Sequence, residues 1–441
     1  MLILYINLFP DNLRLLYKKL NWRTTINKIG KNLLTKGCYV LNFEINERNE
    51  FFLAKVKSFL IENNVEESFN SDLERFPLHL REIAGKENLI GLDISKDDGG
   101  LGLDLVTMGL LYKECGTASV NARELIGAGH GRILSEFGDV QLKKSIIPSL
   151  LKGRSLIGIG LTEPDCGSDL SSIKTFATKH KDGYLINGEK EWVSRIDEAN
   201  YFIVFCQTKK DSGVHGITPF LIPMDDSNIE KYYKEPMGLK GWSYGGFKME
   251  NVFIPAEYRI SEEGNGFKIF NSHFEYWRVL MALICIGSAE KATNLAINYA
   301  KTRNSFGGPI GRFQAVMHKI SDNLTKLESA KLLCIKALSL LDKGLNCTKE
   351  VAMAKWYGTY SAYEAIDNVM QIFGARGYVK EFGIEQRLRD VRGLMIADGS
   401  NDVMKSIIGR EVFGKNIYKQ MYGWREQIPY DNKAIYGSSV I

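Results

Sequence analysis

The spacing of apolar residues changes twice along the chain, and this limits the possible folds more than any other feature. From about Glu50 to Arg154 apolar residues recur every three or four positions, as in packed helices. From Ser155 to about Gly266 glycine and proline become dense and short β-rich runs appear, after which helical spacing returns. Helices therefore precede and follow one β-rich region. This order argues against a β–α–β nucleotide-binding domain.

The central region contains several runs that predict strands. Tyr201–Cys206 is continuously apolar, which is typical of a buried strand. Three further runs have strand character: Tyr184–Asn187, Ile217–Ile222 and Asn251–Ile254. The predicted fold class is α+β. We expect a basic N-terminal extension over 1–48, a helical domain over 49–155, a β-domain over 156–262, a helical domain over 263–418 and a tail over 419–441.

Composition and charge exclude several classes of protein. The chain has 441 residues, of which 44% are apolar and 25% charged, as in ordinary globular proteins. Its net charge of +5 arises within residues 1–45, and the remainder is neutral, so nucleic acid is not an expected partner. The longest apolar run, Val279–Gly287, is much shorter than the roughly 20 residues that cross a bilayer. We therefore expect no transmembrane segment.

Residues 1–45 and the cysteines bear on localisation. The basic, acid-poor segment 1–45 has the character of an organelle presequence or of a basic extension, and it shows no secretory cleavage site. The seven cysteines are scattered without a CxxC pair, which favours free, mostly buried thiols in a reducing compartment. We expect a cytoplasmic protein, or a mitochondrial matrix protein if 1–45 is a presequence. The isolated histidines predict no metal site.

Three segments carry candidate chemistry. Leu161–Asp169 (LTEPDCGSD) is a loop with hydroxyls and backbone N–H groups suited to an anion or a heteroaromatic ring, or simply a tight turn. In Asn187–Ser194, Trp192 and Ser194 would share one face of a strand, although a tryptophan is more often a core residue. Farther on, Gln371–Tyr378 and Arg387–Asp390 precede Asp398, which lies before a final helix and would serve there as a base or only as a cap.

Together, and in this order, these segments resemble the acyl-CoA dehydrogenase family of flavoproteins. The resemblance extends from about Glu50 to Lys415 and rests on four motifs: LTEPxxGSD, GxKxWVS, RxxFG with a later Gln, and QxxGxxGY followed by RxRD. It implies a helical domain, a middle β-domain and a C-terminal four-helix bundle. It also implies bound FAD and an acyl thioester substrate.

The resemblance assigns roles position by position. It implies that Thr162 lies at the flavin ring, Ser168 near the pyrophosphate, and Trp192 and Ser194 against the ring. Arg278 matches an arginine of the acyl channel, and Ser168 also borders the substrate. The full set of implied FAD contacts is Leu161, Thr162, Gly167, Ser168, Trp192, Val193, Ser194, Arg303, Phe306, Gln314, Gln371, Gly374, Ser400 and Asp402. Of these, Arg303, Phe306, Gln314, Gln371 and Gly374 would hold the FAD of a neighbouring subunit, which implies a homodimer or homotetramer.

The expected catalytic base departs from the family pattern. The family usually has a glutamate before Gly-Thr or Gly-Ser, and this chain has Asp398 there. Some members place the glutamate before the channel arginine, where this chain has Trp277, and Glu275 would face elsewhere on the helix. Asp398 is therefore the predicted catalytic residue. Aspartate is one methylene shorter, and such a loss of reach lowers rates by about 10²-fold unless the loop compensates.

Three interpretations follow. Asp398 serves α,β-dehydrogenation of an acyl thioester, with CoA or an acyl carrier protein as carrier and an electron-transfer flavoprotein as acceptor. Alternatively the chain is a flavin oxidase or monooxygenase. Nitroalkane-oxidising relatives combine such an aspartate with a cation seven residues later, here Lys405. The third interpretation is a weakly active or non-enzymatic flavoprotein.

Two further positions differ from the family pattern. Ala375 replaces a common glycine, and the bulky Tyr276 and Trp277 suggest a short or polar acyl group.

Overall fold

The computed structural model describes residues 47–69 and 75–414, so the segment 1–45 and the tail 419–441 lie outside the described residues. The first part is helical, and side-chain caps define several helix starts. Asp104 accepts from Thr107 N at 2.8 Å, and Asp139 accepts from Gln141 N at 2.7 Å. The elements are α3 (Glu47–Glu62), α4 (Val65–Ser68), α5 (Leu78–Lys86), η3 (Lys96–Asp98), α6 (Leu105–Ala118), η4 (Val120–Leu125), α7 (Gly131–Phe137) and α8 (Val140–Leu151).

A single seven-stranded sheet follows. Its strands are β1 (Ile157–Gly160), β2 (Phe176–His180), β3 (Gly183–Ser194), β4 (Tyr201–Gln207), β5 (Ile217–Pro223), β6 (Ile229–Tyr233) and β7 (Tyr244–Pro255). They are ordered β1-β4-β2-β3-β7-β6, with β5 on β4. β1 and β2 run parallel to β4 at different ends of that strand, and the other pairs are antiparallel.

The four predicted strands are confirmed within β3, β4, β5 and β7. No pattern in the sequence indicated β1, β2 and β6 separately. β1 is a four-residue Ile-Gly repeat, and the other two are five-residue strands with charged, largely exposed positions. Short strands of this kind lack the alternation that would distinguish them from loops.

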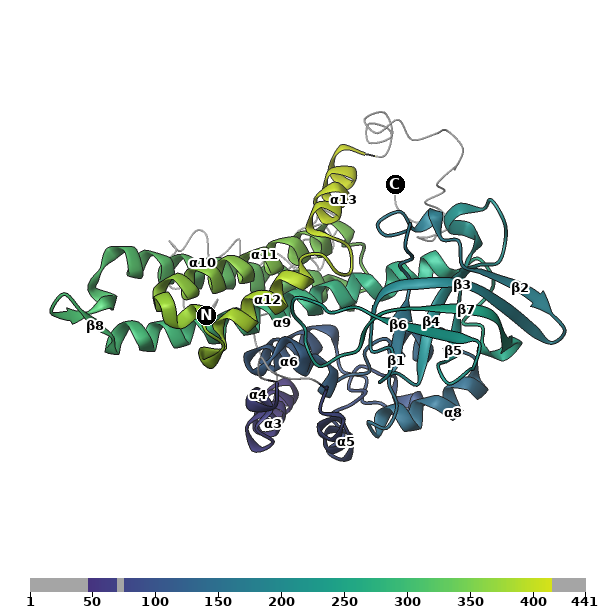
Figure 1. The fold of residues 1–441 in the computed structure, drawn as a ribbon, viewed down its shortest axis with the longest axis horizontal. Helices are drawn as coiled ribbons and strands as arrows, with labels where there is room; N and C mark the ends of the chain where they lie inside the picture. The colour runs from purple at the N-terminus through teal and green to yellow at the C-terminus, as the bar shows by residue number, and fades with distance from the viewer. Residues whose placement is uncertain (1–46, 70–74, 415–441) are drawn as a thin grey trace, which may run out of the picture. The chain divides into compact units, whose positions relative to one another are not determined.

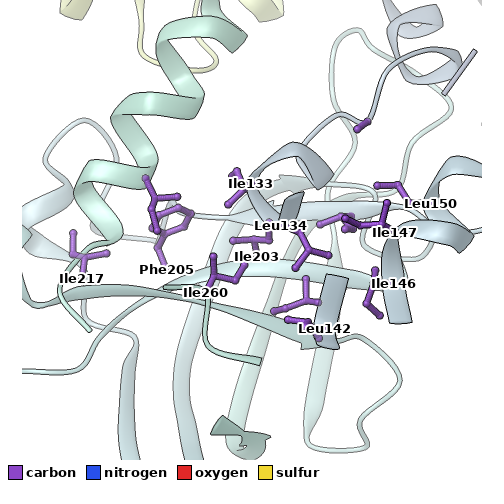
Figure 2. Close-up of a cluster of buried hydrophobic side chains, with 14 of the residues drawn as sticks. Ile133, Leu134, Leu142, Ile146, Ile147, Leu150, Ile203, Phe205, Ile217 and Ile260 are labelled. Atoms are coloured by element: carbon purple, nitrogen blue, oxygen red, sulfur yellow. The ribbon is translucent and has the colours of Figure 1, made fainter. Parts of the chain in front are cut away.

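The first helices and the sheet share one hydrophobic core. Figure 2 shows Ile133 and Leu134 of α7 and Leu142, Ile146, Ile147 and Leu150 of α8 facing Ile203 and Phe205 of β4. All of these side chains are buried. On the opposite face of β4, Phe202 packs against Phe247 of β7 at 5.1 Å, so both faces of the strand are removed from water and its burial is continuous.

The last part is a helical bundle (Figure 1). It consists of α9 (Gly266–Thr302), α10 (Gln314–Asp342), α11 (Thr348–Phe373), α12 (Ile384–Leu394) and α13 (Asn401–Phe413), with a small hairpin of β8 (Asn304–Ser305) and β9 (Gly308–Pro309) after α9. α9 crosses α6 very closely, since a Cβ on Gly287 would overlap Lys113 O and a Cβ on Gly116 would overlap Ile284 O. The predicted α+β class with this domain order is confirmed.

The helix α9 bears on the expectation that the chain has no transmembrane segment. Among the described helices it alone has the length and apolar composition to cross a bilayer, although its longest continuous apolar run is short. Most of the apolar stretch is buried against other parts of the protein. A helix at the centre of a bundle meets the same criteria, because it must be apolar on several faces.

A buried ion pair connects two of the sequence motifs inside the β-domain. Lys190 of β3 is fully buried and donates to Glu163 Oε1 at 2.7 Å and to Leu161 O at 3.1 Å. Glu163 also accepts from the backbone N–H groups of Lys174 and Thr175, at 2.7 and 3.0 Å. Burial raises the pKa of the Glu163 carboxyl, but Lys190 and these donors outweigh burial and lower it. The loop after β1 is therefore tied to β3.

Replacing Lys190 tests this connection. Lys190→Met leaves the Glu163 carboxylate buried without its cation, so we expect the free energy of unfolding to fall by about 3–5 kcal/mol. The matched control is Lys174→Met. It removes a lysine from an exposed pair with Asp165 at 2.9 Å and should change stability little. Urea unfolding measures both, and equal effects would show that the buried pair does not hold the loop.

Candidate active site

The loop after β1 and the end of β3 lie together, as the cofactor prediction requires. Glu191 N donates to Thr162 O at 3.0 Å, which places the Leu161–Asp169 segment beside β3. Gly167 and Ser168 are exposed, and a Cβ on Gly167 would meet no atom within 4 Å. The loop thus presents hydroxyls and an open backbone position on the surface. This set of groups suits the polar part of a flavin nucleotide.

Trp192 stands on a β-bulge that the sequence did not indicate. The register between β3 and β7 shifts between Glu191 and Val193, and Trp192 has φ +61°. Val193 is buried, whereas the Trp192 side chain is 50% exposed, so this tryptophan is not a core residue. Lys234 Nζ lies 4.6 Å from the centre of its ring. A half-exposed indole followed by the partly buried Ser194 is consistent with a platform for the isoalloxazine ring.

Two buried cations hold the loop that carries Asp398. This loop joins α12 to α13, and Asp398 has φ +60°. Arg278 Nε of α9 donates to Asp398 O at 2.8 Å, and Lys355 Nζ of α11 donates to Gly399 O at 2.6 Å. Lys355 also bonds Asn401 Oδ1 at 3.1 Å. The hydrogen bonds from α9 and α11 thereby fix the conformation of the loop.

Ser400, and not Asp398, caps the following helix. Ser400 is the N-cap of α13 and its Oγ accepts from Val403 N at 3.3 Å. The interpretation of Asp398 as a simple cap is therefore wrong. Asp402 lies in the first turn of α13 with its side chain 93% exposed.

The Asp398 carboxyl lies among positive charges. Asp398 itself is half-buried, and burial is the largest influence on the pKa of its carboxyl. Burial raises its pKa, and the charges of Lys355, Arg123, Arg278 and Arg195 oppose this rise without cancelling it. Burial in turn lowers the pKa of Lys355 to about 8 and that of Arg278 to about 10. A desolvated carboxylate with a raised pKa is suited to accept a proton.

The other candidate groups make contacts of their own. Glu275 is hydrogen-bonded at 2.6 Å to Thr348 Oγ1 at the start of α11, and Trp277 is buried. Lys405 is half exposed, 3.9 Å from Asp402 and 5.1 Å from the centre of the Trp356 ring. The aspartate–Lys405 pairing expected for a nitroalkane-oxidase-like site is thus absent among the described contacts. Lys355 and Arg278 are the cations that hold the Asp398 loop.

The second group of predicted FAD contacts lies at the far end of α9 from the sheet (Figure 1). Arg303 follows α9, and Phe306 in the β8–β9 hairpin is 88% exposed. Tyr299 of α9 stacks on Phe373 of α11 at 4.4 Å, which brings the end of α11 to Arg303. Gln314, Gln371 and Gly374 complete this group. Arg278, which contacts the Asp398 loop, precedes Arg303 by 25 residues, or roughly 38 Å along α9, so one chain does not join the two groups.

The RxRD motif proves to be structural in the described contacts. Arg387 donates to Ser288 Oγ at 3.1 Å and to Glu66 Oε1 at 2.8 Å. Asp390 accepts from Leu239 N at 2.6 Å, and Arg389 donates to Met237 O at 2.7 Å. The motif ties α12 to the first helices and to the segment before β7.

Sequence reasoning missed several buried charged residues near Asp398: Lys355, Arg123, Glu124 and Arg195. Lys355 interrupts an otherwise apolar face of α11, which was the available signal. The others belong to short irregular segments, where no periodicity indicates burial.

The fold together with the relatives of this chain defines a flavin-dependent oxidoreductase that acts on CH–CH bonds of acyl thioesters, with FAD as cofactor. Family models for the N-terminal, middle and C-terminal domains of acyl-CoA dehydrogenase match residues 46–154, 158–252 and 264–413. The chain belongs to the acyl-CoA dehydrogenase family.

Individual relatives agree with this assignment. An acyl-CoA dehydrogenase of Bacillus subtilis is 33% identical, over 77% of this chain and 91% of the relative. Subunit CarC of the caffeyl-CoA reductase-Etf complex of Acetobacterium woodii is 33% identical, over 81% of this chain and 94% of the relative. The structure of the glutaryl-coenzyme A dehydrogenase glutaryl-CoA complex has a TM-score of 0.80 and 27% identity, covering 85% of this chain and 97% of that one.

Stability distinguishes the roles of Ser400 and Asp398. Ser400→Ala should lower the free energy of unfolding by about 1 kcal/mol through loss of the cap. Asp398→Asn should instead raise the melting temperature at pH 7. The pKa of Asp398 in the folded state is above the ordinary 3.8. The folded state therefore loses stability as pH rises from 3.8 through the folded pKa, and an amide at this position avoids that loss.

Below pH 3.8 the carboxyl is protonated in both states, and this difference between wild type and Asp398→Asn should disappear. Thermal unfolding of the FAD-loaded protein across pH measures it. A lower melting temperature for Asp398→Asn at pH 7 would mean that the carboxylate stabilises the fold.

Proposed function

We propose that this protein dehydrogenates an acyl-CoA thioester between its α and β carbons, with Asp398 as the base that removes the α-proton. The observation that carries the proposal is the Asp398 loop, which Arg278 and Lys355 fix while burial raises the pKa of its carboxyl. Proton abstraction from a weak carbon acid requires a base held in contact with the substrate and only partly hydrated. The fixed loop and the desolvated carboxyl support this role for Asp398.

The remaining residues bind and orient. Leu161, Thr162, Gly167, Ser168, Trp192, Val193, Ser194 and Ser400 would hold FAD, whose flavin accepts the β-hydrogen as hydride. Asp402 belongs to the same predicted set, at the exposed start of α13. Arg278, buried beside Asp398, would border the acyl channel together with Ser168. The positive charges around Asp398 favour its ionised form, and they also favour negative charge that develops on the substrate when the α-proton leaves.

The shorter side chain of aspartate is compatible with this role. Asp398 takes a left-handed backbone conformation, which is strained for a residue other than glycine. Such strain persists where the surrounding contacts over-determine it, and it is common at active sites. The hydrogen bond from Arg278 to the Asp398 carbonyl maintains this conformation. We infer that the loop, rather than side-chain length, sets the reach of the carboxylate.

Replacement of the base tests the proposal. Asp398→Asn should keep FAD and the fold but slow flavin reduction by a thioester by about 10²–10⁴-fold, the usual contribution of a positioned base. Asp398→Glu is the matched variant and should remain active. Anaerobic stopped-flow mixing with a series of acyl-CoAs measures both. Normal reduction by the Asn variant would exclude Asp398 as the base.

We also propose that the cofactor site is completed by a second copy of the chain, in a homodimer or homotetramer. The separation of the two groups along α9 supports this. We further propose that electrons pass to an electron-transfer flavoprotein, because the CarC relative is a subunit of an Etf complex.

The Arg303→Ala variant tests whether a second copy of the chain completes the cofactor site. Because Arg303 lies at the far end of α9, its loss should reduce FAD occupancy and weaken assembly together. Flavin absorbance and size-exclusion chromatography report on both. A fully loaded protein with an unchanged elution volume would remove Arg303 from the cofactor site.

A further inference from the structure

Three arginines and one glutamate form a buried group next to the Asp398 loop. We define the arginine cluster as Arg81 of α5, Arg123 and Glu124 of η4, and Arg195 directly after β3. All four side chains are buried. Arg195 Nη2 pairs with Glu124 Oε1, Arg123 Nε lies 3.2 Å from the same oxygen, and Arg81 Nη1 donates to the Glu124 carbonyl.

The cluster has an excess of positive charge. Two guanidinium groups, those of Arg123 and Arg195, pair with the single carboxylate of Glu124, and the third, that of Arg81, donates only to the Glu124 carbonyl. In the described part of the chain, Nε of Arg81 and Nε of Arg195 are buried and have no hydrogen-bond partner. Burying a cation without a counter-charge or acceptor is unfavourable by several kcal/mol. The Asp398 carboxyl also acts on Arg123 and Arg195, but three guanidinium groups still outnumber the two carboxylates, so the arginines are suited to a further anion.

The arginine cluster acts electrostatically on Asp398, the predicted base. Arg195 follows Ser194, the predicted flavin contact, and its φ of +73° marks a turn at the end of β3. The charges of Arg123 and Arg195 both act on the Asp398 carboxyl, where they lower the pKa against the larger effect of burial. An anion held by these arginines would thus lie within the electrostatic reach of the base.

The cluster is also rigid. The Arg195 guanidinium lies 5.3 Å from the centre of the Trp242 ring, and Trp242 stacks on Phe76 at 3.7 Å. Arg123 Nη1 donates to Val120 O at 2.8 Å and to Asn121 Oδ1 at 3.2 Å. A planar guanidinium fixed in this way matches a carboxylate, which it binds with two parallel hydrogen bonds. The phosphates of FAD are expected instead at the exposed Gly167–Ser168 loop.

We propose that the arginine cluster binds a carboxylate on the acyl chain, so that the substrate is the CoA thioester of a dicarboxylic acid. This inference rests on the proposed function, because the acyl group must reach Asp398 for either to hold. Arg123 and Arg195 are the residues that determine specificity. Glu124 positions Arg195 and limits the charge of the cluster.

The test compares substrates that differ only in this charge. Succinyl-CoA, glutaryl-CoA and adipoyl-CoA are each paired with the neutral monomethyl ester, and anaerobic flavin reduction by the FAD-loaded protein is followed. We expect the best carboxylated thioester to exceed its ester by roughly 10²-fold or more in the second-order rate, since the ester leaves buried cations unpaired. Arg123→Gln and Arg195→Gln should remove most of this preference.

Arg259→Gln is the control, because it removes a guanidinium paired with Glu262 and Glu263 in the β-domain and should keep the preference. Equal rates for acid and ester in the wild type would overturn the inference and leave the proposed function standing. An unchanged preference in both cluster variants would also overturn it. If neither form of any thioester reduces the flavin, the proposed function fails as well. If the cluster variants do not fold, the wild-type comparison of acid with ester decides.

Discussion

The arrangement of the active site depends on two cations that donate to backbone carbonyls. Arg278 on α9 and Lys355 on α11 reach the same loop, at Asp398 O and Gly399 O. Each cation is buried and thereby loses its contacts with water, and in this low-dielectric environment its hydrogen bonds to the loop are stronger. Two helices of the bundle thus define the position of one carboxyl group that belongs to a short connection.

Other buried charges assemble the surroundings of this loop from distant parts of the sequence. The Glu163–Lys190 pair sets the loop after β1 against β3. Arg387, Arg389 and Asp390 tie α12 to the first helices and to the segment before β7. Because α12 leads directly into the Asp398 loop, these contacts place the base relative to the Trp192 platform. Motifs that identify the family therefore include residues whose described contacts hold together the elements around the site.

The sequence predicted the architecture well, because it depends on the apolar periodicity of long elements. The α+β order and the strands within β3, β4, β5 and β7 follow from that pattern. It did not predict the bulge at Trp192, which requires the register of β7, or the burial of Lys355 and Arg195, which depends on contacts between distant segments. The resemblance singled out Asp398, and Lys405, which belonged to the nitroalkane-oxidase alternative, lies 3.9 Å from Asp402 at the start of α13.

The most direct test of the central claim separates proton removal from oxidation. Phenylacetyl-CoA has α-hydrogens but no β-hydrogen that can leave, so an active base exchanges its α-hydrogens with solvent while the flavin stays oxidised. Incubation of the FAD-loaded protein with this thioester in D₂O, followed by mass spectrometry, measures the exchange. We expect deuterium to enter with wild-type protein and to be slowed by about 10²-fold or more in Asp398→Asn. Equal exchange by the two proteins would show that another group removes the proton.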